Sequence, residues 1–278
     1  MYGSGLVRLL RGTPVHPVGP DGRMAVSDHF REFRARLLKI TLIWLIGFAL
    51  SLYFHDQLLD IVFGPYREAQ RALPNGTTET IIQGAAQPLM VYLSLSALAT
   101  TVLSAPLWLY QLWAFVVPGL HRHEKKWTAI FVTVAGPLFL VGVTIGYVTL
   151  PKGLEVLIGF TPDNFKNLVD FNHYLTFFSR TLLVFGIAFE IPVFVVLLNL
   201  AGVVKGRTLA EYRHWIIIGV FVFAAVATPS TDPFTMTAMA IPMCLLFLFS
   251  EVIARVHDRR KAAREPFTGL SPDEASVI

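Results

Sequence analysis

The stretch "VFGIAFEIPVFVVLL", residues 184–198, is apolar apart from one carboxylate, that of Glu190. It lies within the run 181–200, which has the length of about 20 residues that a helix needs to cross a bilayer. A carboxylate at the centre of such a helix costs about 2.5 kcal/mol or more to insert. The run therefore predicts a membrane-spanning helix in which one polar group needs a specific reason to be present.

The composition of the whole chain extends this interpretation beyond one helix. Of its 278 residues, 54% are hydrophobic and only 15% are charged, and the mean hydropathy is +0.57. Soluble domains carry about 25% charged residues, and the charges of this chain gather between long apolar stretches. We therefore expect an all-α integral membrane protein. Its single cysteine, Cys244, excludes an internal disulfide and a site built on several thiolates.

Six stretches are apolar enough to be predicted as membrane spans. They are 37–54, one within 80–120, 127–150, 181–200, 215–228 and 234–250. The second stretch is too long for one straight helix and contains Pro88 and Pro106, so we expect a kinked helix with a re-entrant or surface piece. The fifth and sixth spans are short and should thin the bilayer or lie against longer neighbours.

The distribution of lysine and arginine predicts the orientation of these spans. Alternate connecting segments hold most of the 23 basic residues, namely 1–39, 121–126, 201–214 and 251–278. Cytoplasmic segments of membrane proteins are enriched in these residues, so both termini are predicted to be cytoplasmic. The same segments explain the pI near 9.3, which we assign to topology and anionic lipid rather than to nucleic acid.

The two ends of the chain read as tails around one membrane domain. Residues 1–26 are rich in proline and glycine and are expected to be a flexible tail, within which Met24 is an alternative start to Met1. Residues 27–255 form the predicted six-span domain. The basic and polar segment 256–278 is expected to be disordered.

Two cytoplasmic stretches contain candidate binding residues. In "DHFREFRARLL", 28–38, Glu32 and Arg36 are four residues apart and can pair on a helix, on the side that also carries His29 and Phe33. An amphipathic interfacial helix with an ordinary salt bridge is the alternative. This stretch precedes the first predicted span.

The second stretch is "APLWLYQLWAFVVPGLHRHEKK", 105–126. Its tryptophans, Trp108 and Trp113, suit an interfacial belt. Glu124 is the lone acid of a basic loop. The alternative is that it only balances the charge of this loop. His121, His123 and Glu124 could imitate a metal site, but no second group of ligands supports one, so no metal is expected.

Glu190 has three alternative roles within its span: a protonated and inert group, a proton relay, or a polar contact for another helix. Pro192 removes the backbone bond to the carbonyl of residue 188 and opens the helix beside the carboxylate. No lysine or arginine lies in the middle of another span. We therefore expect the partner of Glu190 to be water, a backbone group or a residue of another protein.

The connection "ATPSTDPFTM", 227–236, joins the last two spans and places Asp232 in a tight turn, where it could also cap the following helix. The sequence contains no GxSxG, HExxH, P-loop or GxGxxG pattern in a credible setting. The chain is therefore not expected to be an enzyme or to hold a cofactor.

These four stretches, followed by "AIPMCLLF", 240–247, occur in an order that strongly resembles the TatC family, the multispanning receptor subunit of the twin-arginine protein translocase. The resemblance covers roughly 27–255. Two departures are visible: Phe30 and Phe33 replace leucines of the family's first motif, and Lys125 and Lys126 replace the arginines that often end its loop motif.

The resemblance implies a concave helical bundle and a cytoplasmic site for signal peptides with two consecutive arginines. Glu32 and Glu124 would form that site, with Phe115 and Gln111 beside it. A carboxylate binds a guanidinium through two parallel hydrogen bonds, which a lysine ammonium cannot reproduce. Paired arginines could thus be distinguished from paired lysines.

The resemblance also implies that Glu190 contacts TatA- and TatB-like single-span partners, which would dock near the short fifth and sixth spans in a multi-copy complex. Pro65 and Asp232, both expected in extracytoplasmic turns, would shape this complex together with Pro106 and Pro192. Transport of folded precursors across the bacterial cytoplasmic membrane would use the proton-motive force and no nucleotide. A proton-coupled transporter with Glu190 as relay, and a membrane scaffold, are the alternatives.

Overall fold

The computed structural model describes residues 26–73, 78–116, 125–162, 165–200, 202–228 and 233–264. Nearly all of this part is helical, as the sequence predicts. The helices are α2 Val26–Tyr53, α3 His55–Ala72, α4 Gln87–Leu103, α5 Ala105–Val116, α6 Lys125–Gly159, α7 Phe171–Leu200, α8 Gly206–Glu211, α9 Arg213–Ala227 and α10 Pro233–Arg264. Two short strands, β1 Thr78–Ile81 and β2 Asn167–Asp170, complete it.

The apolar helices identify a multi-pass membrane protein. Four of them, α2, α6, α7 and α10, are long and apolar enough to cross a bilayer. Helices α4 and α5 together pass the same test and are bent by 59° at the break between them. Helix α9 is apolar but has only 15 residues. These six segments fall on the six predicted stretches, while the count of six crossings stays a prediction.

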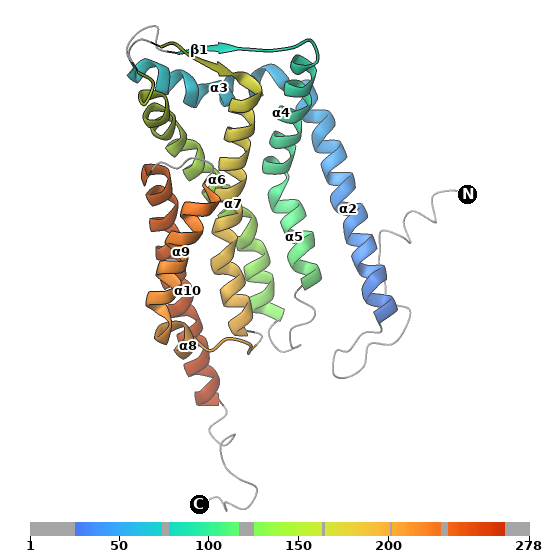
Figure 1. Cartoon of the computed structure of the whole chain (residues 1–278). Coiled ribbons are helices and arrows are strands. Elements are labelled where there is room, and N and C mark those ends of the chain that lie inside the picture. Colours follow the sequence, from blue (N-terminus) through green and yellow to red (C-terminus); the bar gives the residue numbers. More distant parts are fainter. Residues whose placement is uncertain are drawn as a thin grey trace, which may run out of the picture.

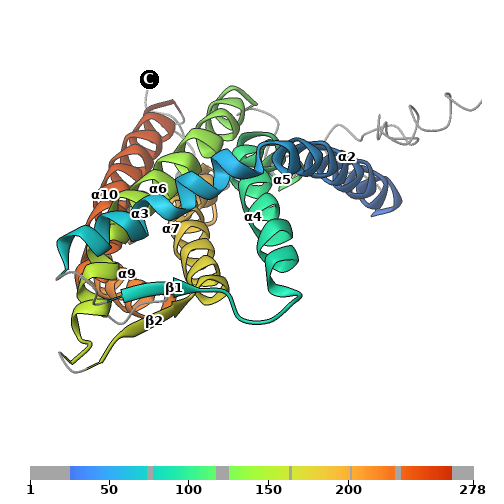
Figure 2. The ribbon, with the colours of Figure 1, turned by 90° about the horizontal axis from the view of Figure 1, so that it is seen from above.

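The upright helices connect two ends of different construction (Figure 1). Helix α3 and the two strands cover one, here called the sheet end, and the view from above shows α3 lying across the bundle (Figure 2). Helix α8 lies at the other, the α8 end, together with the first turn of α2 and the last turns of α10 (Figure 1). Both ends of the described chain thus lie on one side. That this side is cytoplasmic, and that the bundle is concave, stay predictions.

The centre of the bundle is the close pair of α6 and α7. A Cβ on Gly142 would lie 2.6 Å from the carbonyl oxygen of Phe185, and one on Gly186 would lie 2.6 Å from the ring of Phe139. Small residues let membrane helices approach to backbone contact, where van der Waals packing holds them together. These two glycines therefore set the distance between α6 and α7.

The predicted kink in the second span lies at Pro106. This proline is the second residue of α5, just after the bend at Ser104. A Cβ on Gly136 would lie 2.6 Å from the Cα of Pro106, so α6 packs directly against the bend. Pro88 lies in the first turn of α4, where a proline continues a helix without strain, and it causes no kink.

The sheet and α3 were not predicted from the sequence. Strands β1 and β2 pair in parallel from Thr78 opposite Asn167 to Ile81 opposite Asp170. The buried hydroxyls of Tyr66, on α3, and Thr78 are hydrogen-bonded at 2.8 Å. This contact ties the sheet to α3.

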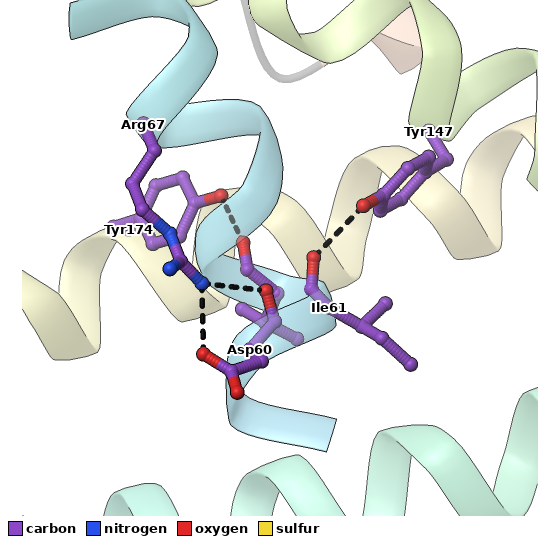
Figure 3. A network of polar contacts seen from close by, with 6 residues as sticks. Asp60, Ile61, Arg67, Tyr147 and Tyr174 are labelled. Atoms are coloured by element: carbon purple, nitrogen blue, oxygen red, sulfur yellow. Dashed lines mark hydrogen bonds and ion pairs between the residues drawn. The ribbon is translucent and has the colours of Figure 1, made fainter. Parts of the chain in front are cut away.

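Pro65 lies inside α3, not in a turn as we expected. A proline in a helix leaves the carbonyl four residues earlier without its N–H donor, and here that carbonyl belongs to Ile61. The hydroxyl of Tyr147, on α6, donates to this oxygen at 3.0 Å. The hydroxyl of Tyr174, on α7, donates to the carbonyl of Val62 at 2.6 Å. Two tyrosines therefore dock this proline-containing helix onto the bundle (Figure 3).

Helix α10 is longer than the predicted sixth span. It continues through Glu251, where the apolar stretch ends, to Arg264, and so passes residue 255, where we expected the membrane domain to end. The helix is thus longer than its apolar part, residues 234–250, while the length of the sixth span within the membrane stays a prediction.

Candidate functional site

The first candidate site lies at the α8 end, between α2 and α5. Arg36 donates to Glu32 from Nε at 2.9 Å and from Nη2 at 2.6 Å, and both bonds end on the same oxygen, Oε1. The side chains are 20% and 15% exposed, respectively. The predicted pair is present, and it is shielded rather than fully in solvent. No described residue donates to Oε2 of Glu32, so this oxygen is left for another donor.

Residues of α5 complete this face. Gln111 Oε1 lies 3.5 Å from Nη1 of Arg36. The ring of Phe115 stacks on His29 at a centroid distance of 4.5 Å and lies 5.4 Å from the ring of Phe33. Residues 29, 33 and 36 share one side of α2, and Gln111 and Phe115 are one turn apart on α5. The structure thus brings together four of the residues that sequence reasoning singled out, Glu32, Arg36, Gln111 and Phe115.

Helix α2 runs without a break from Val26 to Tyr53, so this face continues directly into the first apolar span, and the alternative of an ordinary salt bridge on an amphipathic helix stays open. Two predicted site residues, Glu124 and Asp232, lie outside the described residues. The pairing of Glu32 with Glu124 therefore stays a prediction. Among the described residues, no cluster of His, Cys, Asp or Glu could hold a metal ion.

The second candidate site surrounds Glu190 in α7. This side chain is 8% exposed, and its Oε2 accepts a hydrogen bond from Nε1 of Trp113 at 3.1 Å. Its other oxygen, Oε1, is buried without a hydrogen-bond partner among the described residues. Buried polar atoms are nearly always paired. Only one of the two carboxylate oxygens of Glu190 therefore has a hydrogen-bond partner in the described structure.

Trp113 is the residue of this candidate site that sequence reasoning misplaced. We expected it in an interfacial belt, but it is buried, 7% exposed, and its ring lies 6.2 Å from that of Phe194. A buried indole N–H needs an acceptor, and this requirement was the signal from which a contact of Trp113 with a polar group could have been predicted.

Pro192, two residues after the carboxylate, lies inside α7, and its carbonyl accepts from the hydroxyl of Ser250, on α10, at 3.2 Å.

A third polar cluster joins α9 to α10, and the sequence analysis did not identify it. Glu251 has a side chain only 2% exposed. It accepts from Arg213 through both oxygens, at 2.9 Å and 2.7 Å, and lies 2.6 Å from Nη2 of Arg255. The spacing of Glu251 and Arg255 was visible in the sequence, whereas the pairing across helices was not. We call Arg213, Glu251 and Arg255 the basal clamp.

The comparisons with known proteins agree with one another. The family model described as "Sec-independent protein translocase protein (TatC)" matches residues 28–242. A "Sec-independent protein translocase protein TatC" of Frankia casuarinae is 40% identical over 93% of this chain and 74% of its own length. A relative of the same name from Xylanimonas cellulosilytica is 36% identical over 87% of each chain.

Solved structures support the same relationship. A crystal structure of the "Twin Arginine Translocase Receptor- TatC in DDM" superposes with a TM-score of 0.67 at 30% identity, covering 81% of this chain and 99% of that chain. A second crystal structure of that receptor gives a TM-score of 0.66. The similarity extends over nearly the whole of the solved receptor.

Proposed function

The chain belongs to the TatC family of Sec-independent protein translocase proteins, and from this premise we propose that it binds the Arg-Arg signal peptides of folded precursors. The site would lie between α2 and α5 and would face the cytoplasm of a bacterial cell. The protein would act as the receptor of a translocase in the cytoplasmic membrane. It would use the proton-motive force and would not be an enzyme.

The observation that carries this proposal is that only one carboxylate oxygen of Glu32 is hydrogen-bonded by a described residue. Arg36 occupies Oε1 alone and holds the side chain in one orientation. An incoming guanidinium can then bind Oε2 through a charge-assisted hydrogen bond. Exposed ion pairs contribute only about 0–1 kcal/mol, but this carboxylate is 15% exposed, so a bond to it is less screened by water.

The aromatic rings beside Glu32 supply the second part of the site. Phe33, which is 47% exposed, and Phe115 offer ring faces over which a guanidinium can stack. They also offer an apolar surface for the hydrophobic part of a signal peptide. Glu124, in the loop after α5, would bind the second arginine.

Assembly with small single-span partners, TatA- and TatB-like, is the second part of the proposal. Oε1 of Glu190, which has no partner among the described residues, would accept a hydrogen bond from a polar side chain of such a helix. Helix α9 would be the main docking surface, since Ala224 is its only buried residue in the described structure. Membrane lipid and further copies of the complex would cover the rest of the apolar surface.

The test is photocrosslinking from a probe placed at Leu112 of α5, which is 43% exposed. Precursors with Arg-Arg and Lys-Lys signals are compared on wild type, Glu32→Gln, Glu124→Gln and the control Glu79→Gln. Glu79 forms an exposed ion pair with Lys166 at the sheet end, so it reports the same chemical change far from the site. We expect a strong Arg-Arg signal that both site variants lose and the control keeps.

Equal crosslinking of the two precursors to the wild-type protein would contradict the proposal. In that case the alternative function is proton-coupled transport through Glu190, whose buried and unpartnered oxygen favours it. Proton uptake into liposomes that hold this chain alone, lost in Glu190→Gln, would then be the result to seek.

A further inference from the structure

The short helix α9 is weakly held by packing. Ala224 is the only one of its 15 residues that is buried in the described structure. Its main neighbours in the described chain are α10 and, at its start, α8, and Ala224 also belongs to an apolar cluster with Phe185 and Phe189 of α7. Val222 and Val226 are 58% and 82% exposed. Apolar contact alone therefore does not determine the position of α9 against the bundle.

The basal clamp supplies the missing constraint at the first residue of α9. Arg213 binds both oxygens of Glu251, and a planar guanidinium that forms two parallel bonds fixes direction as well as distance. The carboxylate is 2% exposed, whereas Arg213 is 43% exposed. The buried acid is thus the fixed part of the clamp, and α9 is the part that it holds.

Helix α8, which precedes α9, is anchored to α10 in the same region. Asp258 accepts from the backbone N–H of Gly206 at 2.6 Å and from Nδ2 of Asn199 at 3.1 Å. A Cβ on Gly206 would lie 2.7 Å from the backbone nitrogen of Arg255, so α8 contacts the backbone of α10 directly. Helix α8 and the adjoining part of α10, against which Arg213 is held, are therefore fixed to each other.

We propose that Glu251 is a positioning residue which, through Arg213, fixes the angle of α9 and so determines where a partner's membrane helix docks. This inference rests on the proposed function, because it assumes that single-span partners dock on α9. The two arginines of the clamp have different tasks. Arg213 joins α9 to α10, whereas Arg255 pairs with Glu251 within α10 and leaves the angle of α9 unchanged.

This difference provides a matched pair of variants, Arg213→Gln and Arg255→Gln. Both remove one guanidinium from the same carboxylate, and the two side chains are 43% and 40% exposed. The test uses the full-length protein in nanodiscs, with Cys244→Ser as background and spin labels at Val148 on α6 and Val222 on α9. Both labelled positions are exposed, at 69% and 58%.

We expect a narrow distance distribution between the labels in the parent protein and in Arg255→Gln, and a broadened one in Arg213→Gln and Glu251→Gln. In membranes with the single-span partners, a photocrosslinker at Val222 should lose partner adducts severalfold in the latter two variants only. Signal-peptide crosslinking at Leu112 should stay at the parent level in all of them.

An unchanged distribution in Arg213→Gln would overturn the proposal. Equal broadening in Arg213→Gln and Arg255→Gln would also overturn it, because it would show a general loss of stability. If the parent protein formed no partner adduct at Val222, the docking part of the proposed function would fail, whereas the distance measurement would still decide whether the clamp positions α9.

Discussion

Glu190 and Glu251 are both carboxylates on membrane helices and both are nearly buried, with 8% and 2% exposure. Their surroundings differ. Both oxygens of Glu251 are bound, by two guanidiniums of the same chain. Glu190 has one indole donor and one oxygen without a partner in the described structure. A buried charge is tolerated when it is fully paired. Glu251 is thus fully paired within its own chain, whereas Glu190 keeps the unpaired oxygen that our proposal of a contact with another molecule requires.

The largest expected effect is that of Glu251→Ala. The substitution removes the common partner of two guanidiniums at the junction of α9 and α10, so the charged contact that joins the two helices is lost. We expect a severalfold loss of folded protein and no transport. Fluorescence-detected size exclusion and a thermal unfolding scan measure the first effect. Normal yield and transport would remove the structural role assigned to Glu251.

Glu190→Ala should abolish transport while the protein stays folded. It leaves the indole N–H of Trp113 unpaired, which costs about 1–3 kcal/mol, but it also removes a buried carboxylate. Signal-peptide crosslinking should be unchanged, because Trp113, which binds Glu190, lies two residues from both Gln111 and Phe115 and so faces another side of α5. Glu190→Gln, which keeps an acceptor for Trp113, should retain part of the transport. Loss of precursor binding in Glu190→Ala would end the division between the two sites.

Trp113→Phe should have an intermediate effect. It removes the one described donor to Glu190 and keeps most of the ring packing against Phe194. Leaving the buried carboxylate without this donor costs about 1–3 kcal/mol or more, and transport should fall severalfold rather than vanish. Trp108→Phe is the matched control, since its Nε1 donates to the carbonyl of Thr101 instead. Equal loss in both variants would indicate that general packing, not Glu190, is responsible.

The smallest expected effect is that of Tyr147→Phe at the sheet end, far from both carboxylates. It removes the hydroxyl that donates to the carbonyl of Ile61 (Figure 3). The free energy of unfolding should fall by about 1 kcal/mol, with transport at the wild-type level. Denaturant unfolding followed beside a transport assay checks both statements. A large transport defect would assign a functional role to the contact between α3 and α6.

The sequence predicts the spans well where the physical signal is local. An apolar run of sufficient length identifies α7 and α10, and Pro106 identifies the bend between α4 and α5, because both follow from neighbouring residues. Helix α3 was missed because its polar residues read as a connecting loop. Its position depends on carbonyl contacts from Tyr147 and Tyr174, which are distant in the chain.

The candidate site shows the same limit. The pairing of Glu32 with Arg36 was predictable from the four-residue spacing within one helix. The bond from Trp113 to Glu190 joins residues 77 positions apart, and that from Arg213 to Glu251 joins residues 38 apart. The apolar periodicity of one helix does not show which residue of another helix will contact it. The continuation of α10 past Glu251 was missed for this reason, since the charge of Glu251 is compensated by Arg213 from another helix.

The central claim is that the α2–α5 face distinguishes paired arginines from paired lysines. The most direct test measures the Kd of Arg-Arg and Lys-Lys signal peptides for the purified protein in nanodiscs, at one salt concentration. We expect the Lys-Lys peptide to bind at least about tenfold more weakly, a difference of about 1.4 kcal/mol, and Glu32→Gln to remove most of that difference. Equal affinity of the two peptides for the wild-type protein would contradict the assignment of this face as a twin-arginine receptor.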